Sequence, residues 1–200
     1  METETKNLYD VILSVLTLVG AGVALGLGLY QWRRSQAWQR ADKLDKFIEK
    51  FESDELLRLA AVVVDWELRE TKFCGRHLTV CNKDALLALR NHDEMPANAE
   101  FEDEQPTIRD AYDSLLAFFQ RLELSISHKL IDKGPAKDYF AYWLEHFLRF
   151  DRHPDEGGTI LKSITPEAKV AAYINAYGDM ESIKRLCHKF GVSPPGSQSV

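Results

Sequence analysis

The sequence lacks the motifs that mark the common catalytic and nucleotide-binding sites. It contains no GxGxxG, no GxxxxGK[ST] and no GxSxG, which are the signatures of dinucleotide-binding folds, phosphate-binding loops and serine hydrolases. No Glu-x-x-His pair of the kind that di-iron bundles use is present either, because Glu145 and His146 are adjacent and Glu123 and His128 are five residues apart. We therefore predict no cofactor, and the function has to be argued from the segments of the chain.

The sequence is also poor in cysteine and has no excess of positive charge. Its three cysteines, Cys74, Cys81 and Cys187, are odd in number and far apart, which does not indicate a disulfide framework. A net charge of −6 gives no reason to expect a nucleic acid as partner. The length of 200 residues suits one ordinary domain and an anchor.

Charge is missing altogether from Val11 to Tyr30, where the chain reads VILSVLTLVGAGVALGLGLY. About 20 apolar residues, at about 1.5 Å each, span a hydrocarbon core about 30 Å thick. Such a segment must be helical in lipid, since its backbone groups find no other partners there. The sequence predicts a transmembrane helix over residues 11–32. A signal peptide is the alternative, with small residues near Gly26 and Gly28 as a cleavage site, but its leader is normally basic, and METETKNLYD is acidic.

The flanks of this segment predict its orientation. Cations gather after it, at Arg33, Arg34, Arg40, Lys43, Lys46 and Lys50. The positive-inside rule then places residues 1–10 outside and the rest of the chain in the cytoplasm, as in a single-pass protein of the cell (inner) membrane. The same basic stretch has the charge to touch anionic lipid. Asp42, Asp45 and Glu49 interrupt it, which favours a solvated helix face.

Small residues follow one another along the predicted membrane helix. Gly20, Ala24 and Gly28 repeat every four residues, and Gly22 and Gly26 form a GxxxG beside them. Small residues at this spacing let two helices approach closely in lipid. We predict a homodimer through this face; the alternative is that glycine and alanine are simply common in membrane helices.

The remaining chain predicts an all-α fold, a small multi-helix bundle in the cytoplasm. We expect a juxtamembrane amphipathic helix over 33–52, a helical domain over 53–191 and a disordered tail over 192–200. Ser53 has the residue type of an N-cap for a helix through LLRLAAVVVDWELRE. Residues 71–82 are expected to be irregular, residues 83–91 to form a short helix, and the acidic, proline-containing residues 92–106 to form a loop. We expect no strand.

A long helix is the clearest element of this domain. Apolar residues alternate at steps of four and three, at Ile108, Tyr112, Leu115, Phe119, Leu122, Ile126 and Leu130. Thr107 is the expected cap, with Asp110 as its capping-box partner, and Gly134 is the expected end. A tight connection to a helix carrying Phe140, Trp143, Leu144 and Phe147 predicts an antiparallel hairpin. Two more helices are expected, one beginning at Thr165-Pro166-Glu167 and one capped by Asp179 and ended by Gly191.

The run LLAFFQRLELSISHKLIDKGPAKDYFAYWLEHF resembles a hairpin in a bacterial family of membrane-anchored proteins without an assigned activity. The resemblance lies in a Phe-Phe pair (Phe118, Phe119), a Leu-Ile-Asp turn (Leu130-Ile131-Asp132) and an aromatic-rich helix with Tyr139, Phe140 and Trp143. The family more often has an acid after the Phe pair, where this chain has Gln120. The resemblance implies an N-terminal membrane helix and a helical cytoplasmic domain, and brings no catalytic residue with it.

One group of residues has metal-ligand chemistry. Cys74, His77, Cys81 and His92 supply thiolates and imidazoles, the ligands that zinc takes. Their spacing matches no standard finger, and a loop tucked under the domain by its cysteines and Leu78 explains them equally. Cys187 and His188 are neighbours on a helix, so their side chains diverge by about 100° and form no catalytic dyad; Cys187 is expected in the core.

Taken together, these patterns predict a membrane-anchored helical interaction or regulatory module without catalytic activity. Its expected partners are the lipid bilayer, a second copy of the chain and another protein. The alternative is a metal-dependent (zinc) sensor or enzyme that uses Cys74, His77, Cys81 and His92.

Overall fold

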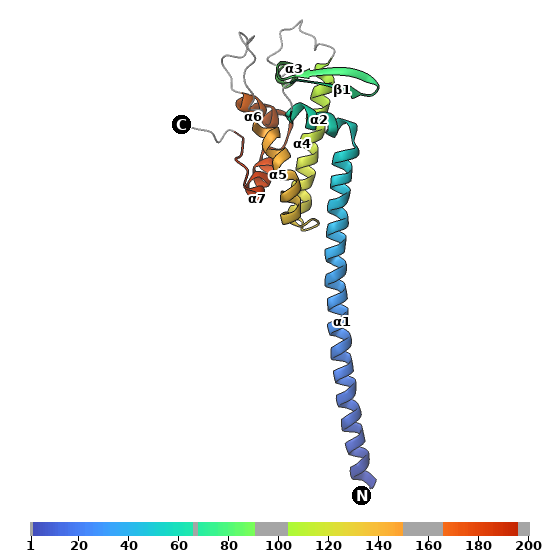
Figure 1. Cartoon of the computed structure of the whole chain (residues 1–200). Coiled ribbons are helices and arrows are strands. Elements are labelled where there is room, and N and C mark those ends of the chain that lie inside the picture. Colours follow the sequence, from blue (N-terminus) through green and yellow to red (C-terminus); the bar gives the residue numbers. More distant parts are fainter. Residues whose placement is uncertain (1, 66–67, 91–103, 150–165, 196–200) are drawn as a thin grey trace. The chain divides into compact units, whose positions relative to one another are not determined.

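The computed structural model describes residues 2–65, 68–90, 104–149 and 166–195. Over these residues it contains seven helices and one two-stranded sheet (Figure 1). The predicted all-α class is confirmed. The chain divides into two units, Met1–Asp42 and Lys43–Val200, which we call the N-terminal unit and the folded unit. His153-Pro154 and Gly157-Gly158 also predict a loop. That segment and most of the predicted loop at 92–106 lie outside the described residues.

Helix α1 runs from Glu2 to Ser53 and contributes to both units. Within the described residues it is the one helix that is long and apolar enough to cross a membrane. Its last turns carry the predicted amphipathic stripe, and here the prediction is confirmed. Leu44 and Phe51 are buried, and Phe47 and Ile48 pack partly against the core of the folded unit.

Helix α2 (Glu55–Asp65) begins one residue later than predicted and ends earlier. Ser53 is the last residue of α1 and not the cap. Asp54 caps α2 instead, because its Oδ1 accepts hydrogen bonds from the backbone N–H groups of Leu56 (3.0 Å) and Leu57 (3.3 Å). The predicted continuation of this helix to Glu70 is wrong, since residues 68–70 belong to a strand.

A β-hairpin replaces the irregular segment that we predicted. Strand β1 (Leu68–Phe73) pairs antiparallel with β2 (Arg76–Cys81), and Phe73 lies opposite Arg76. The two-residue turn works because Cys74 (φ 47°) and Gly75 (φ 77°) both adopt left-handed conformations, as a type I′ turn requires. Residues alternate along β2, with Leu78 and Val80 buried and Thr79 exposed. The short helix α3 (Asn82–Ala88) follows.

Helices α4 (Gln105–Ser127) and α5 (Lys133–Arg149) form the predicted antiparallel hairpin. The hydroxyl of Tyr112, early in α4, donates to the carbonyl oxygen of Phe147, late in α5 (2.9 Å), while Phe118, later in α4, packs on Phe140, earlier in α5. Six of the seven predicted stripe residues of α4 are buried; Leu130 lies beyond the helix and is exposed.

Both predicted ends of α4 are wrong. The helix begins before Thr107, its N-cap is Glu104 without a side-chain cap, and Pro106 sits in the first turn. Thr107 is therefore already the third helical residue, Asp110 lies further along α4, and neither caps the helix. At the other end Lys129 adopts a left-handed conformation (φ 57°), and the Leu130 N–H donates to the Ser125 carbonyl (2.9 Å). This is the local geometry that ends helices. Gly134 lies inside the first turn of α5.

Helices α6 (Pro166–Tyr177) and α7 (Met180–Phe190) end the fold as predicted. Oδ1 of Asp179 accepts from the N–H groups of Glu181 (3.1 Å) and Ser182 (3.2 Å), and Gly191 closes α7 with φ 72°. Both are the residue types that these positions favour.

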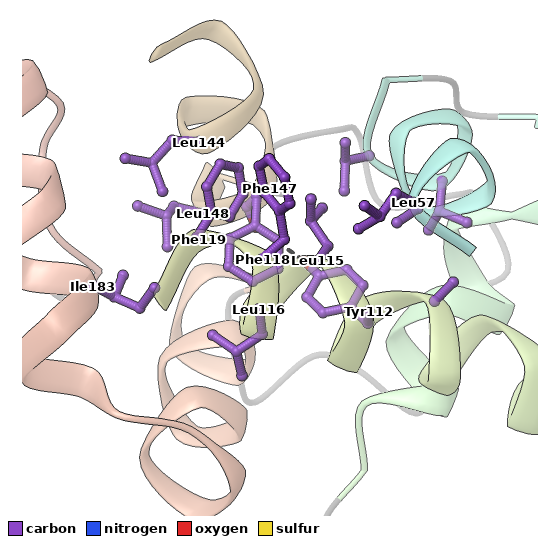
Figure 2. Close-up of a cluster of buried hydrophobic side chains, with 14 of the residues drawn as sticks. Leu57, Tyr112, Leu115, Leu116, Phe118, Phe119, Leu144, Phe147, Leu148 and Ile183 are labelled. Atoms are coloured by element: carbon purple, nitrogen blue, oxygen red, sulfur yellow. Dashed lines mark hydrogen bonds between the residues drawn. The ribbon is translucent and has the colours of Figure 1, made fainter. Parts of the chain in front are cut away.

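The core of the folded unit forms where α4 meets its neighbours. Figure 2 shows the rings of Phe119 and Phe147 close together, with Leu57 of α2 on one side and Ile183 of α7 on the other. The ring centroids of Phe119 and Phe147 are 5.4 Å apart. Both side chains are fully buried, as are Leu115 and Leu144. One continuous apolar core therefore joins elements from α1 to α7.

Candidate functional site

The apolar stretch of α1 lies within the N-terminal unit. From Leu13 to Tyr30 every residue is exposed. Its large apolar side chains expose between 54% (Leu29) and 76% (Leu18) of their surface. A soluble protein rarely exposes apolar patches larger than a few hundred Å². The segment thus combines an exposed apolar surface with the length that a helix needs to cross a membrane.

The small residues of this stretch lie on two opposite sides of the helix. Neighbouring residues are about 100° apart in an α-helix, so the row Gly20, Ala24 and Gly28 faces about 180° away from the row Gly22 and Gly26. The expectation that they sit beside each other is therefore wrong. A Cβ added at any of these four glycines would meet no atom within 4 Å. Both rows are open for close approach, and helix dimerisation stays a prediction.

Aromatic and cationic side chains follow the apolar stretch. Tyr30, Trp32 and Trp38 are each more than 60% exposed, and Arg33 and Arg34 between them are exposed as well. Tyrosine and tryptophan are enriched where a membrane helix meets the headgroups, and arginine follows on the cytoplasmic side. This arrangement agrees with the flank that the sequence predicts.

The predicted zinc ligands sit in and around the hairpin. Cys74 is exposed in the turn, and its thiol donates to Oε2 of Glu55 (3.3 Å). This hydrogen bond is the main reason why the pKa of Cys74 is raised above its ordinary value, and desolvation adds a smaller contribution. A zinc ligand must be a thiolate, so a metal bound at Cys74 would have to displace this proton and its hydrogen bond to Glu55.

The other three candidate ligands are spread along the chain. His77 is exposed in β2 opposite Lys72, and Cys81 lies opposite Leu68 at the far end of the same strand. His77 and Cys81 are four positions apart in an extended strand, which is about 13 Å along the backbone. His92 lies outside the described residues. Where side chains are described, no three His, Cys, Asp or Glu residues gather as metal ligands would; the complete zinc set stays a prediction.

Cys187 lies in the core, as expected. It is fully buried on α7 beside Leu186, and this burial raises the pKa of its thiol to about 12. A thiol of this kind stays protonated and unreactive at neutral pH. The structure gives Cys187 a packing role.

A buried carboxylate that sequence reasoning did not single out joins α4 to α7. Glu123 exposes 1% of its surface, and its Oε1 accepts hydrogen bonds from Lys189 Nζ (2.7 Å), Ser127 Oγ (2.7 Å) and Arg185 Nε (3.2 Å). Burial alone would raise the pKa of Glu123, but these three donors outweigh it and lower the pKa. Lys189 also donates to Ser127. The sequence does carry one signal for this site: an acidic residue stands between Leu122 and Ile126, within the apolar stripe of α4.

A second polar cluster ties the ends of α3, α4 and α6. Nη1 of Arg109 donates to the carbonyl oxygens of Arg90 (2.9 Å) and Ala88 (3.4 Å). The guanidinium of Arg109 stacks over the rings of Tyr173 (5.2 Å to the centroid) and Tyr177 (4.6 Å), a favourable cation–π arrangement. Arg109 thus satisfies backbone groups that the end of α3 leaves without helical partners.

Glu123 and Arg109 both contact groups within the folded unit. Both therefore hold neighbouring helices together. No family model, curated protein or solved structure shows significant similarity to this chain. The resemblance to a bacterial membrane-anchored family accordingly stays an expectation.

Proposed function

We propose that the chain is a single-pass membrane protein whose folded unit works in the cytoplasm as a non-catalytic interaction or regulatory module. One observation carries the proposal: an uncharged helical segment, Leu13–Tyr30, on which every side chain is exposed. In lipid this surface is already solvated, whereas in water each fully exposed leucine would forgo about 1.5–3 kcal/mol of burial.

The orientation is supported by the charges at the two ends of the segment. Before it stand Glu2, Glu4, Lys6 and Asp10, a net acidic leader, and after it stand Arg33 and Arg34. Basic residues near a membrane helix are retained on the cytoplasmic side. The proposal therefore places the N-terminus outside the cell membrane.

Cys74 offers a natural reporter for this topology, because it is exposed on the folded unit whereas Cys187 is buried. A membrane-impermeant maleimide, applied at pH 8 because the pKa of Cys74 is raised, should label Cys74 in spheroplasts only after permeabilisation. Cys81→Ser in all samples and Cys74→Ser as a control make the signal specific. In the Cys74→Ser background, Thr3→Cys should be labelled without permeabilisation.

Each alternative gives a different result. Labelling of Cys74 in intact spheroplasts contradicts the orientation. Recovery of the full-length chain in the soluble fraction without detergent contradicts the anchor. An intact mass that lacks the first residues of the chain would show that a signal peptase removes the segment.

The proposed partners are a second copy of the chain and another protein. Crosslinking in native membranes, followed by identification of what is attached, tests both. For the copy, Gly20→Leu with Gly28→Leu should abolish association if their row is the contact, and Gly22→Leu with Gly26→Leu is the matched control on the opposite side. If neither pair weakens association in membranes, the contact through small residues should be dropped.

A further inference from the structure

Five residues at the end of the apolar stretch form what we call the collar: Tyr30, Trp32, Arg33, Arg34 and Trp38. Its aromatic side chains expose 64%, 61% and 67% of their surface, respectively. No acidic residue occurs between Asp10 and Asp42, so no carboxylate in this stretch neutralises the two arginines. The collar differs in this from the cations at 43–50, which alternate with Asp45 and Glu49.

Helix geometry directs the collar toward the apolar stretch. Side chains on an α-helix tilt toward its N-terminus, so that each covers the turn before its own Cα. Because the apolar stretch precedes the collar in α1, the side chains of Arg34 and Trp38 lean back toward it. Tyr30, Arg34 and Trp38 also follow at steps of four, which places them in one row.

We propose that the collar binds the headgroups of anionic phospholipids. The proposal rests on the membrane anchoring proposed above. Arginine is suited to phosphate because its planar guanidinium donates two parallel hydrogen bonds. Tyrosine and tryptophan suit the headgroup layer because an apolar ring carries a polar N–H or O–H. Lipid is the occupant that fits, since the collar continues the apolar surface and its charge is opposite to that of the headgroups.

The test uses the full chain in nanodiscs that contain equal parts of phosphatidylglycerol and phosphatidylcholine. The protein is released for native mass spectrometry, and the lipids that remain bound are identified. Each cation near an anionic surface strengthens binding about fivefold. We expect phosphatidylglycerol to be retained at least about fivefold over phosphatidylcholine, and Arg33→Gln with Arg34→Gln to bring this ratio close to one.

Lys46→Gln with Lys50→Gln removes the same charge from the folded-unit part of α1 and should leave the ratio unchanged. A wild-type chain without preference, a preference that survives loss of both arginines, or equal loss in the control would overturn the proposal. Insertion into nanodiscs of pure phosphatidylcholine tests the anchor by itself. A chain that inserts there but shows no anionic preference keeps the proposed function and loses the collar.

A photocrosslinker decides what covers the collar. With p-benzoylphenylalanine in place of Trp38, irradiation in the mixed nanodiscs should yield mainly lipid adducts. Exclusive crosslinking to a second copy, or to another protein in native membranes, would show that a protein interface occupies this side and would overturn the proposal.

Discussion

The N-terminal unit and the folded unit treat apolar side chains in opposite ways. Between Leu13 and Leu29 each large apolar side chain is more than half exposed, whereas Leu115, Phe119 and Leu144 of the folded unit are fully buried. Leucine content alone does not separate the two, since both are rich in leucine. What differs is the pattern: an unbroken apolar run suits lipid on all sides, and a stripe repeating at three and four residues suits one protein face.

The strongest test of this difference between the units places charge on the exposed apolar surface. Val19 and Val23 are 57% and 58% exposed, and Leu124 and Leu130 of the folded unit are 55% and 44% exposed. If lipid surrounds the first pair, Val19→Arg with Val23→Arg should cost about 5–7 kcal/mol of membrane insertion. Carbonate extraction of membranes should then release the variant.

Leu124→Arg with Leu130→Arg is the matched control. About half of each of these two side chains is already exposed to water, so the free energy of unfolding should change by only about 0.5 kcal/mol per substitution. Equal behaviour of the two double variants would remove the distinction between the units.

A cavity in the core of the folded unit tests the same difference between the units from its buried side chains. Phe119 is fully buried and packs on Phe118 and Phe147. Phe119→Ala should lower the free energy of unfolding by about 3–5 kcal/mol, through lost burial and the cavity left behind. Urea unfolding of the full chain in a mild detergent measures this change, while membrane association should stay intact. Leu18→Ala in the N-terminal unit should leave the unfolding transition in place.

The buried carboxylate of Glu123 should make the folded unit sensitive to acid. Because the pKa of Glu123 is lowered in the folded state, its ionised form stabilises the fold above the ordinary value near 4.5, and this contribution is lost as the pH falls through the lowered value. Glu123→Gln should cost about 1–2 kcal/mol at neutral pH, and its difference from wild type should shrink as the pH falls below about 4.5.

Glu181→Gln is the control for this prediction. Glu181 pairs with Lys184 at 2.9 Å, but both side chains are exposed, so the loss should be about 0–0.5 kcal/mol. A Glu123→Gln variant as stable as this control at neutral pH would show that the network between α4 and α7 contributes nothing.

The membrane-length helix, the α4–α5 hairpin and the ends of α7 were predictable because their signals are local. Periodicity places Ile108 to Ile126 on one face, and Asp179 and Gly191 carry the residue types that their backbone positions favour. The hairpin at 68–81 was not predicted, because its turn is Cys74-Gly75 instead of the more usual Asn-Gly or Asp-Gly. Among the hairpin side chains that the structure describes, the alternation shows at two buried positions, Leu78 and Val80.

The polar contacts of the folded unit were not predictable from the chain alone. Glu123 meets Arg185 and Lys189 across 62 and 66 residues, so their pairing depends on which helices pack together. The side of α1 on which each small residue lies, in contrast, follows from helix geometry and needs no packing information.

Helix caps give the smallest effect and the finest comparison, because one predicted cap is confirmed and another is wrong. Asp179 accepts two backbone N–H groups at the start of α7, so Asp179→Ala should lower the free energy of unfolding by about 1 kcal/mol. Thr107 has the same apparent role in the sequence but lies inside α4. Thr107→Ala should therefore be close to neutral, since alanine is the better helix former. Thermal unfolding of both variants beside wild type measures the difference. A larger loss for Thr107→Ala than for Asp179→Ala would mean that α4 begins where its sequence pattern indicates, and that Glu104 and Pro106 do not start the helix.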